Sequence, residues 1–254
     1  MEYYLQLKDL MKAGSELPFW QEFYVKFIQA FVENDRYLQY LKGVGNTLMV
    51  TALSLIIGVI LGVLVAVIRT AHDQQRQGKK NPLLGFFNAI CQVYVTVIRG
   101  TPMLVQLLIM GFVIFSTSRQ YTAIGILTLG INSGAYVAEI IRGGLMSLDP
   151  GQAEAGRSLG LNYIDTMRFI VIPQAFKAIL PSLSNEFITL LKDTALIYTI
   201  GGQELLYAAK AISSRTYEQM FPLVGTALIY LDLVMLFTWL QNILERRLRQ
   251  SDRR

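Results

Sequence analysis

The stretch VGNTLMVTALSLIIGVILGVLVAVI, residues 44–68, carries no charged side chain over 25 residues and is rich in Leu, Ile and Val. A helix needs roughly 20 predominantly apolar residues to cross about 30 Å of hydrocarbon. Gly58 and Gly62 add the GxxxG spacing that lets membrane helices approach one another closely. The stretch therefore predicts a membrane-spanning helix.

Other segments extend this to an all-α, polytopic membrane bundle of five transmembrane helices. The further predicted spans are residues 100–118, 120–138, 178–200 and 221–244. Residues 83–98 are apolar but short, and a residue before proline, here Thr101 before Pro102, avoids the helical region. We interpret residues 83–99 as a partly embedded or tilted helix that leads into the span after Pro102.

The distribution of basic residues predicts the topology, because Lys and Arg in short loops mark the cytoplasmic side. Five spans place the basic loop after the first span and the basic tail, 245–254, on one face, with the N-terminus outside. Six spans would place them on opposite faces. The residues concerned are Arg69, Arg76, Lys79 and Lys80 in the loop, and Arg246, Arg247, Arg249, Arg253 and Arg254 in the tail.

The first 43 residues form a predicted extracytoplasmic segment ahead of the transmembrane domain, residues 44–244. Charges interrupt this segment throughout, which is unlike a cleavable signal peptide. Aromatic residues recur at helical spacing and indicate an amphipathic helix that either lies in the outer membrane interface or packs on the chain's own bundle. These residues are Phe19, Trp20, Phe23, Phe27 and Phe31.

Composition excludes several function classes. The chain is 53% hydrophobic and 16% charged, whereas soluble domains carry about 25% charged residues. One cysteine, Cys91, and one histidine, His72, argue against a disulfide framework, a metal site and a Ser-His-Asp triad. No catalytic residue and no nucleic-acid partner are predicted.

A long loop, residues 142–176, follows the third span. Asp149 can cap a helix that starts at Pro150, with Gln152 completing a capping box. Gly160 can end this helix in a left-handed conformation. A second segment, residues 162–171, is predicted to end at Pro173.

This loop resembles the EAA motif of the permease subunits of bacterial ABC importers. Gly156 stands where the motif has its second alanine, and Ile172 replaces a leucine. The matching residues are Glu154, Ala155, Gly160, Ile170 and Pro173.

Three further segments resemble the polar amino acid branch of that family: residues 99–106, 133–144 and 185–194. The resemblance covers roughly residues 40–245 and implies an inner-membrane permease subunit of a polar amino acid importer. It also implies two ATP-binding ABC subunits that hold ATP and Mg, a second permease copy or paralogue, and an extracytoplasmic amino-acid-binding protein. No cofactor is expected on this chain.

The chain has no GxxxxGK[ST] phosphate loop, so energy must come from a partner. A short, exposed helix in the loop could pass ATP-driven closure to the third and fourth spans as a rigid-body movement. The alternative is a solvated linker helix. The residues predicted to couple to the ATPase are Gln152, Glu154, Ala155, Gly156, Arg157 and Gly160.

Polar residues within the third and fourth spans suggest substrate contacts, because ionisable groups in spans usually face a partner or a pathway. Glu186 could receive the substrate ammonium, and Asn132, Ser133 or Asn185 could bind its carboxylate. Tyr136 and Thr189 share faces with these residues. The alternative is hydrogen bonding between helices of the bundle.

Two other function classes compete with the permease. An ion-gradient-driven secondary transporter of a small polar solute would usually show more spans and inverted repeats, which we do not find. A membrane-embedded enzyme would need a converging set of catalytic groups.

Overall fold

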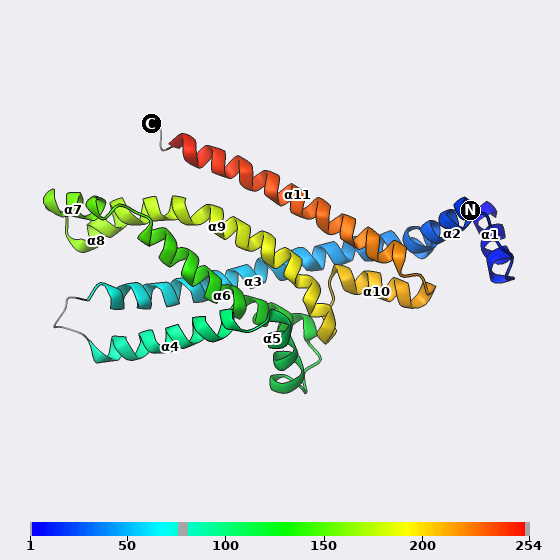
Figure 1. Ribbon diagram of the computed structural model, residues 1–254, viewed down its shortest axis with the longest axis horizontal. Coiled ribbons are helices and arrows are strands. Elements are labelled where there is room, and N and C mark those ends of the chain that lie inside the picture. Colours follow the sequence, from blue (N-terminus) through cyan, green and yellow to red (C-terminus); the bar gives the residue numbers. More distant parts are fainter. Residues whose placement is uncertain (1, 76–80, 252–254) are drawn as a thin grey trace.

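The computed structural model describes residues 2–75 and 81–251, and these contain helices and no strand (Figure 1). The helices are α1 Glu2–Lys12, α2 Phe19–Phe31, η1 Glu33–Asp35, α3 Arg36–Asp73, α4 Pro82–Gly100, α5 Met103–Ile109, η2 Met110–Ile114, α6 Tyr121–Met146, α7 Pro150–Ser158, α8 Tyr163–Thr166, η3 Met167–Val171, α9 Ile172–Asp193, η4 Thr194–Ile200, α10 Leu205–Thr216 and α11 Met220–Ser251. The predicted all-α class is confirmed.

Four helices of the described chain are long and apolar enough to cross a membrane: Glu33–Asp73, Pro82–Gly100, Tyr121–Met146 and Met220–Leu248. They include the predicted spans 44–68, 120–138 and 221–244. The tail is not a separate segment as far as it is described, because residues 245–251 continue α11.

The predicted span over residues 100–118 is wrong in its boundaries. The long apolar helix ends at Gly100, Thr101 and Pro102 are extended, and only the short apolar stretch Met103–Ile114 follows. Proline restrains Thr101 to an extended backbone, so one continuous helix cannot run through this point. Residues 83–99 therefore belong to a helix, Pro82–Gly100, that is long and apolar enough to cross a membrane by itself, which the short uncharged run does not suggest.

The predicted span over 178–200 is shifted as well. Helix α9 begins at Ile172 and ends at Asp193, after which the chain tightens into the 3₁₀ helix η4. Four charged residues keep α9 outside the set of strongly apolar helices: Lys177, Glu186, Lys192 and Asp193. Helix α9 packs against α6 and α11 inside the bundle.

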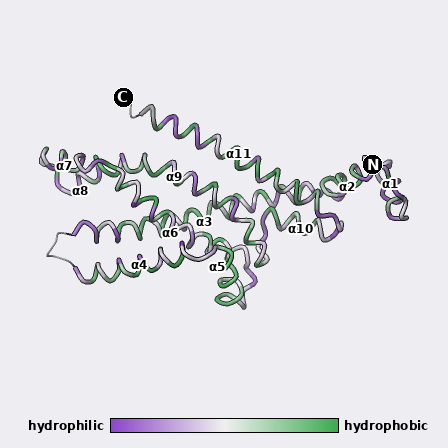
Figure 2. Tube along the Cα trace, viewed as in Figure 1, coloured by the Kyte–Doolittle hydropathy of each residue, from purple (hydrophilic) through white to green (hydrophobic). Residues whose placement is uncertain are grey.

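Five long helices, α3, α4, α6, α9 and α11, run past one another with alternating direction (Figure 1). The end of α3, the start of α4, helix α7 and the end of α11 lie together at one end of the molecule. Helices α1, α2 and α10 lie at the other end. Polar residues gather around α7 in the hydropathy view (Figure 2). Of the predicted cytoplasmic cations, Arg76, Lys79, Lys80, Arg253 and Arg254 fall outside the described residues.

Small residues hold α3 against α6. A methyl group added at Gly58 would lie 2.7 Å from the Ser133 hydroxyl oxygen, and one at Gly62 would lie 2.6 Å from Val137. The GxxxG spacing therefore marks a close helix contact, as the sequence predicts.

Some aromatic residues of helix α2 pack on the bundle, and others are exposed. Phe23 packs on Phe221 of α11, with ring centroids 4.9 Å apart, and Phe31 packs on Tyr40 of α3. Trp20 and Phe19 are 75% and 67% exposed. Helix α2 thus packs on the bundle along one face and presents aromatic side chains along another.

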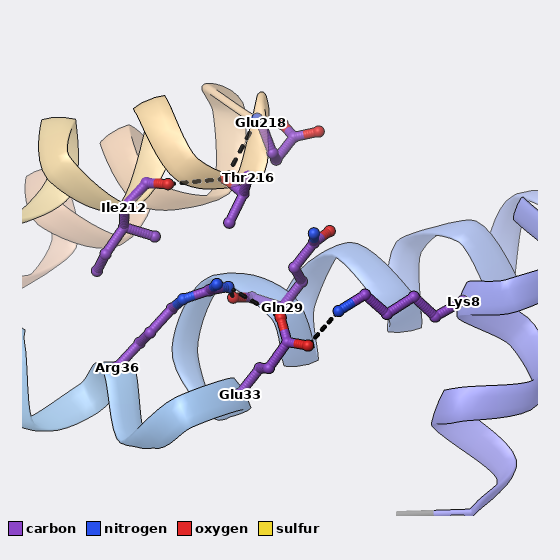
Figure 3. Close-up of polar contacts among 7 residues, drawn as sticks. All are labelled: Lys8, Gln29, Glu33, Arg36, Ile212, Thr216 and Glu218. Carbon is purple, nitrogen blue, oxygen red and sulfur yellow. Dashed lines mark hydrogen bonds and ion pairs between the residues drawn. The ribbon is translucent and has the colours of Figure 1, made fainter. Parts of the chain in front are cut away.

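Ion pairs fix this N-terminal unit to the start of α3 and to the α10–α11 turn. Lys8 pairs with Glu33, and an Arg36 nitrogen lies 3.2 Å from a Glu33 oxygen (Figure 3). Lys26 lies 3.4 Å from Glu218. Glu22 and Glu218 raise the pKa of Lys26 above its usual value, which keeps this pair charged.

Candidate functional site

Helix α7 begins and ends as its sequence predicts. The Asp149 side chain accepts a 2.8 Å hydrogen bond from the Gly151 backbone, and Pro150 occupies the first helical position. Gly160 has φ +81°, and the bonds from Gly160 to Arg157 and from Leu161 to Gly156 close a Schellman motif. The result is a short helix with both termini fixed.

The predicted capping box at Gln152 is wrong. The Gln152 side chain instead accepts a 3.2 Å hydrogen bond from Gln174 on α9. Helix α9 lies close enough to α7 for the Gln174 amide to reach the Gln152 side-chain oxygen. This bond joins α7 to the start of α9.

The predicted end of the second loop segment at Pro173 is also wrong. The wide π-helical turn η3 runs directly into α9, and Pro173 lies in the first turn of α9. Proline fits there because a first-turn N–H needs no partner within the helix. The loop is thus continuous with α9, with no flexible joint between them.

The two loop glycines have different surroundings. A methyl group at Gly156 would lie 2.9 Å from Ile170 and 3.0 Å from Thr166, so Gly156 lets α7 pack on the following segment. Gly160 has no heavy atom within 4 Å of that position. Gly156 therefore makes a close contact within the loop, whereas Gly160 is open to a partner.

The remaining predicted coupling residues, Glu154, Ala155 and Arg157, are exposed. Beside them, Leu159 and Ile164 are 81% and 72% exposed, apolar side chains that the motif resemblance does not single out. Tyr163 donates a 2.6 Å hydrogen bond to Gln74 at the end of α3. The loop is thus held to the bundle by hydrogen bonds and exposes two apolar side chains, Leu159 and Ile164.

The predicted substrate residues separate into distinct groups. Ser133 donates a 2.8 Å hydrogen bond to Glu186, and both side chains are buried between α6 and α9. Asn185 is exposed, and Thr189 donates to the Asn185 backbone carbonyl at 3.1 Å. The Ser133–Glu186 bond supports the alternative of interhelical bonding for these two residues.

Asn132 belongs to a second group, around the α4–α5 break. It donates a 3.0 Å hydrogen bond to Gln106, whose amide in turn donates to the Ile98 carbonyl at 2.8 Å and to the Thr101 hydroxyl at 2.8 Å. Gln106 therefore satisfies backbone and side-chain acceptors where α4 ends. Asn132 and Glu186 therefore have different hydrogen-bond partners, and their contact with one substrate stays a prediction.

Tyr136 lies one turn further along α6 and is 38% exposed. The Arg99 guanidinium lies 5.3 Å from the centre of its ring. Next to them, Glu139 forms ion pairs with three arginines, from α3, α4 and α6: Arg69, Arg99 and Arg142.

The chain matches the family described as "Binding-protein-dependent transport system inner membrane component" over residues 58–250. It belongs to this family. The match covers the bundle except the first part of α3, the loop with α7 and both groups of polar residues. This permease is therefore a transport subunit and not an enzyme, as predicted.

Relatives named as amino acid permeases resemble it along nearly their whole length. It is 34% identical to the putative glutamine transport system permease protein of Rickettsia bellii, over 89% of this chain and 98% of that protein. It is 35% identical to the arginine transport system permease protein ArtQ of Bacillus subtilis, over 84% and 93%.

Solved structures of ABC transporters also resemble this chain. A chain from a crystal structure of an amino acid ABC transporter with histidines superposes with TM-score 0.74 at 39% identity, covering 83% of this chain and 94% of that one. A chain of the MetNI methionine ABC transporter has TM-score 0.71 at 19% identity, which shows a shared fold. The predicted amino acid ABC permease is confirmed, and the secondary-transporter alternative has no support in these matches.

Proposed function

We propose that this permease forms part of the membrane path of a polar amino acid importer and that α7 transmits the movement of ATP-binding subunits to it. The observation that carries the proposal is the exposed, firmly capped α7 at the end of the molecule where α3 and α11 also have polar termini. Such a helix can seat in a groove of a partner without first having to fold.

The connections of α7 support a coupling role. Three residues separate the end of α6 from the start of α7 at Pro150. Gly156 packs on Thr166 and Ile170, which lead directly into α9. A push on α7 therefore reaches α6 and α9 through short, packed segments, as rigid-body coupling requires.

We propose the topology with the N-terminus outside and the C-terminus in the cytoplasm. Helix α7 shares its end of the bundle with the end of α11, which carries Arg246 and Arg247, and basic residues favour the cytoplasmic side. Helices α1 and α2 then lie at the outer surface, where the exposed Trp20 and Phe19 suit the membrane interface.

The assembly that we propose has two ATP-binding subunits holding ATP and Mg, a second copy or a paralogue of this chain, and an extracytoplasmic amino-acid-binding protein. The family description names binding-protein dependence and supports the last of these. In this assembly the coupling surface is made of Glu154, Ala155, Arg157 and Gly160, with Gln152 and Gly156 holding α7 to the bundle.

Reconstitution tests the proposal. The permease would be placed in liposomes with the ATP-binding subunits and the binding protein, and uptake of labelled glutamine, arginine and cystine measured. We expect uptake of at least one of them that needs both ATP and the binding protein. Uptake by the chain alone, driven by an ion gradient, would overturn the proposal.

A further inference from the structure

The α4–α5 break exposes irregular backbone beside the middle of a membrane helix. Thr101 (φ −117°, ψ 145°) and Pro102 (φ −64°, ψ 135°) are extended, and both are exposed. Gln106 connects them to Asn132, which lies near the centre of the 26-residue helix α6. Non-helical backbone at membrane depth does not face lipid and occurs where protein or a water-filled cavity surrounds it.

The break has its own internal support. Gln106 donates to the Ile98 carbonyl at 2.8 Å and to the Thr101 carbonyl at 3.2 Å, so the end of α4 keeps hydrogen-bond partners. Thr101 also donates to the Val97 carbonyl at 2.9 Å. These hydrogen bonds satisfy the carbonyl groups at the break from within the chain, so no other protein is needed to supply donors for them.

Arg99 carries the charge at this exposed point. Its side chain is 42% exposed, compared with 16% for Arg69 and 32% for Arg142. Its contact with Glu139 is 3.7 Å long, whereas that of Arg142 is 3.2 Å. Of the three arginines that pair with Glu139, Arg99 is thus the most exposed, and its ion pair is longer than that of Arg142.

The cluster contains more positive than negative charge. Within the described part of the chain, Glu139 is the one acid paired with these three arginines. An uncompensated charge at membrane depth is costly, and an anion that entered from the path would reduce that cost. If Arg99 turned to such an anion, Glu139 would keep Arg69 and Arg142 as partners.

We propose that Arg99 binds the α-carboxylate of the amino acid in transit, while the Tyr136 ring holds the guanidinium in place. Arginine offers two parallel N–H donors to a carboxylate, and the aromatic face stabilises its position. The inference deepens the proposed function and rests on it, since it names the substrate group that the path recognises.

Equilibrium binding to the purified permease–ATPase complex in nanodiscs, without the binding protein, tests this. The probes are whichever of labelled glutamine, arginine or cystine the wild-type complex transports, and the α-carboxamide of the same compound. We expect the wild-type complex to prefer the carboxylate. Arg99→Gln should weaken carboxylate binding roughly tenfold or more and remove the preference, because a charged hydrogen-bond partner is lost.

Matched variants separate recognition from structure. Arg119→Gln, an exposed arginine in the loop before α6, should bind like wild type, and Arg99→Lys should restore part of the preference for the carboxylate. If Arg99→Gln fails to assemble, Tyr136→Ala replaces it and should weaken binding about threefold to tenfold, while Tyr136→Phe should not.

Three results would overturn the inference while leaving the proposed function intact: an unchanged carboxylate preference in Arg99→Gln, no preference in the wild type, or no saturable binding by a wild-type complex that transports. A wild-type complex that transports none of the amino acids with ATP would instead contradict the proposed function.

Discussion

The hydroxyl of Ser133 on α6 donates a 2.8 Å hydrogen bond to the carboxyl of Glu186 on α9, and both side chains are buried. The bond connects the two helices that flank the loop with α7. A buried acid inside a membrane bundle needs a partner, and Ser133 supplies one. A substrate role for Glu186 stays a prediction that this bond does not require.

Ser133→Ala should destabilise the permease by about 1–3 kcal/mol, because it leaves a buried acceptor without its donor. Glu186→Gln keeps an acceptor oxygen, so it should unfold near the wild-type temperature and retain ATP-driven uptake. Thermal unfolding and uptake of the reconstituted complex measure both. Loss of uptake in Glu186→Gln at an unchanged melting temperature would contradict this expectation and would support a substrate role for Glu186.

Substitution at Gly62 should separate α3 from α6. The methyl group of Gly62→Ala would lie 2.6 Å from Val137, so we expect destabilisation of about 1–3 kcal/mol from overpacking. Gly45→Ala is the matched control on the same helix, since nothing lies within 4 Å of that position. The control should be neutral or slightly stabilising in thermal unfolding. Equal melting temperatures for the two variants would contradict the close contact.

Glu204, at the end of the bundle opposite α7, predicts a pH effect. Burial raises the pKa of its carboxyl, opposed by hydrogen bonds from Tyr230 and from the first backbone N–H groups of α10. Because the folded-state pKa is raised, its contribution to stability is present below the unfolded-state value and is lost as pH rises through the folded value.

Melting temperatures of the wild type and Glu204→Gln, measured from pH 4 to pH 8, test this. Gln does not ionise, so the wild type should lose stability relative to the variant as pH rises. The variant also carries a destabilisation that does not depend on pH, because its α10 cap is altered. A difference between the two proteins that stays flat over this range would show that Glu204 does not titrate as described.

Gly160→Trp should uncouple the importer. Gly160 has φ +81° and faces open space, so a large side chain both strains the cap and obstructs a docking partner. We expect uptake and substrate-stimulated ATP hydrolysis to fall to background while the complex still reaches the membrane. Gly85→Trp, at an equally open position near the start of α4, is the control. Normal coupling in Gly160→Trp would remove the loop from the mechanism.

Local patterns predict much of this structure. The uncharged run 44–68 and the caps at Asp149 and Gly160 each depend on neighbouring residues, and each is confirmed. The spacing of the EAA-like motif predicts the family, and the match over residues 58–250 confirms it.

The errors arise where tertiary contacts decide between local options. Pro102 predicts a break correctly, but the apolar run on either side does not reveal that α4 forms the long helix. The choice of Gln152 between its own helix end and Gln174 depends on where α9 lies. The hydrogen-bond partners of Asn132 and Glu186 likewise depend on how the helices pack, which the sequence does not show.

Accessibility of a cysteine at position 154 tests the coupling claim most directly. The native chain has one cysteine, Cys91, which is buried, so Glu154→Cys supplies a single exposed thiol. Ser15→Cys supplies one at the end of the molecule that we propose lies outside. With a membrane-impermeant maleimide, the account predicts labelling at position 15 but not at 154 in intact cells. In opened membranes, position 154 should be labelled without the ATP-binding subunits and protected with them. Labelling of position 154 in intact cells, or equal labelling with and without those subunits, would contradict the account.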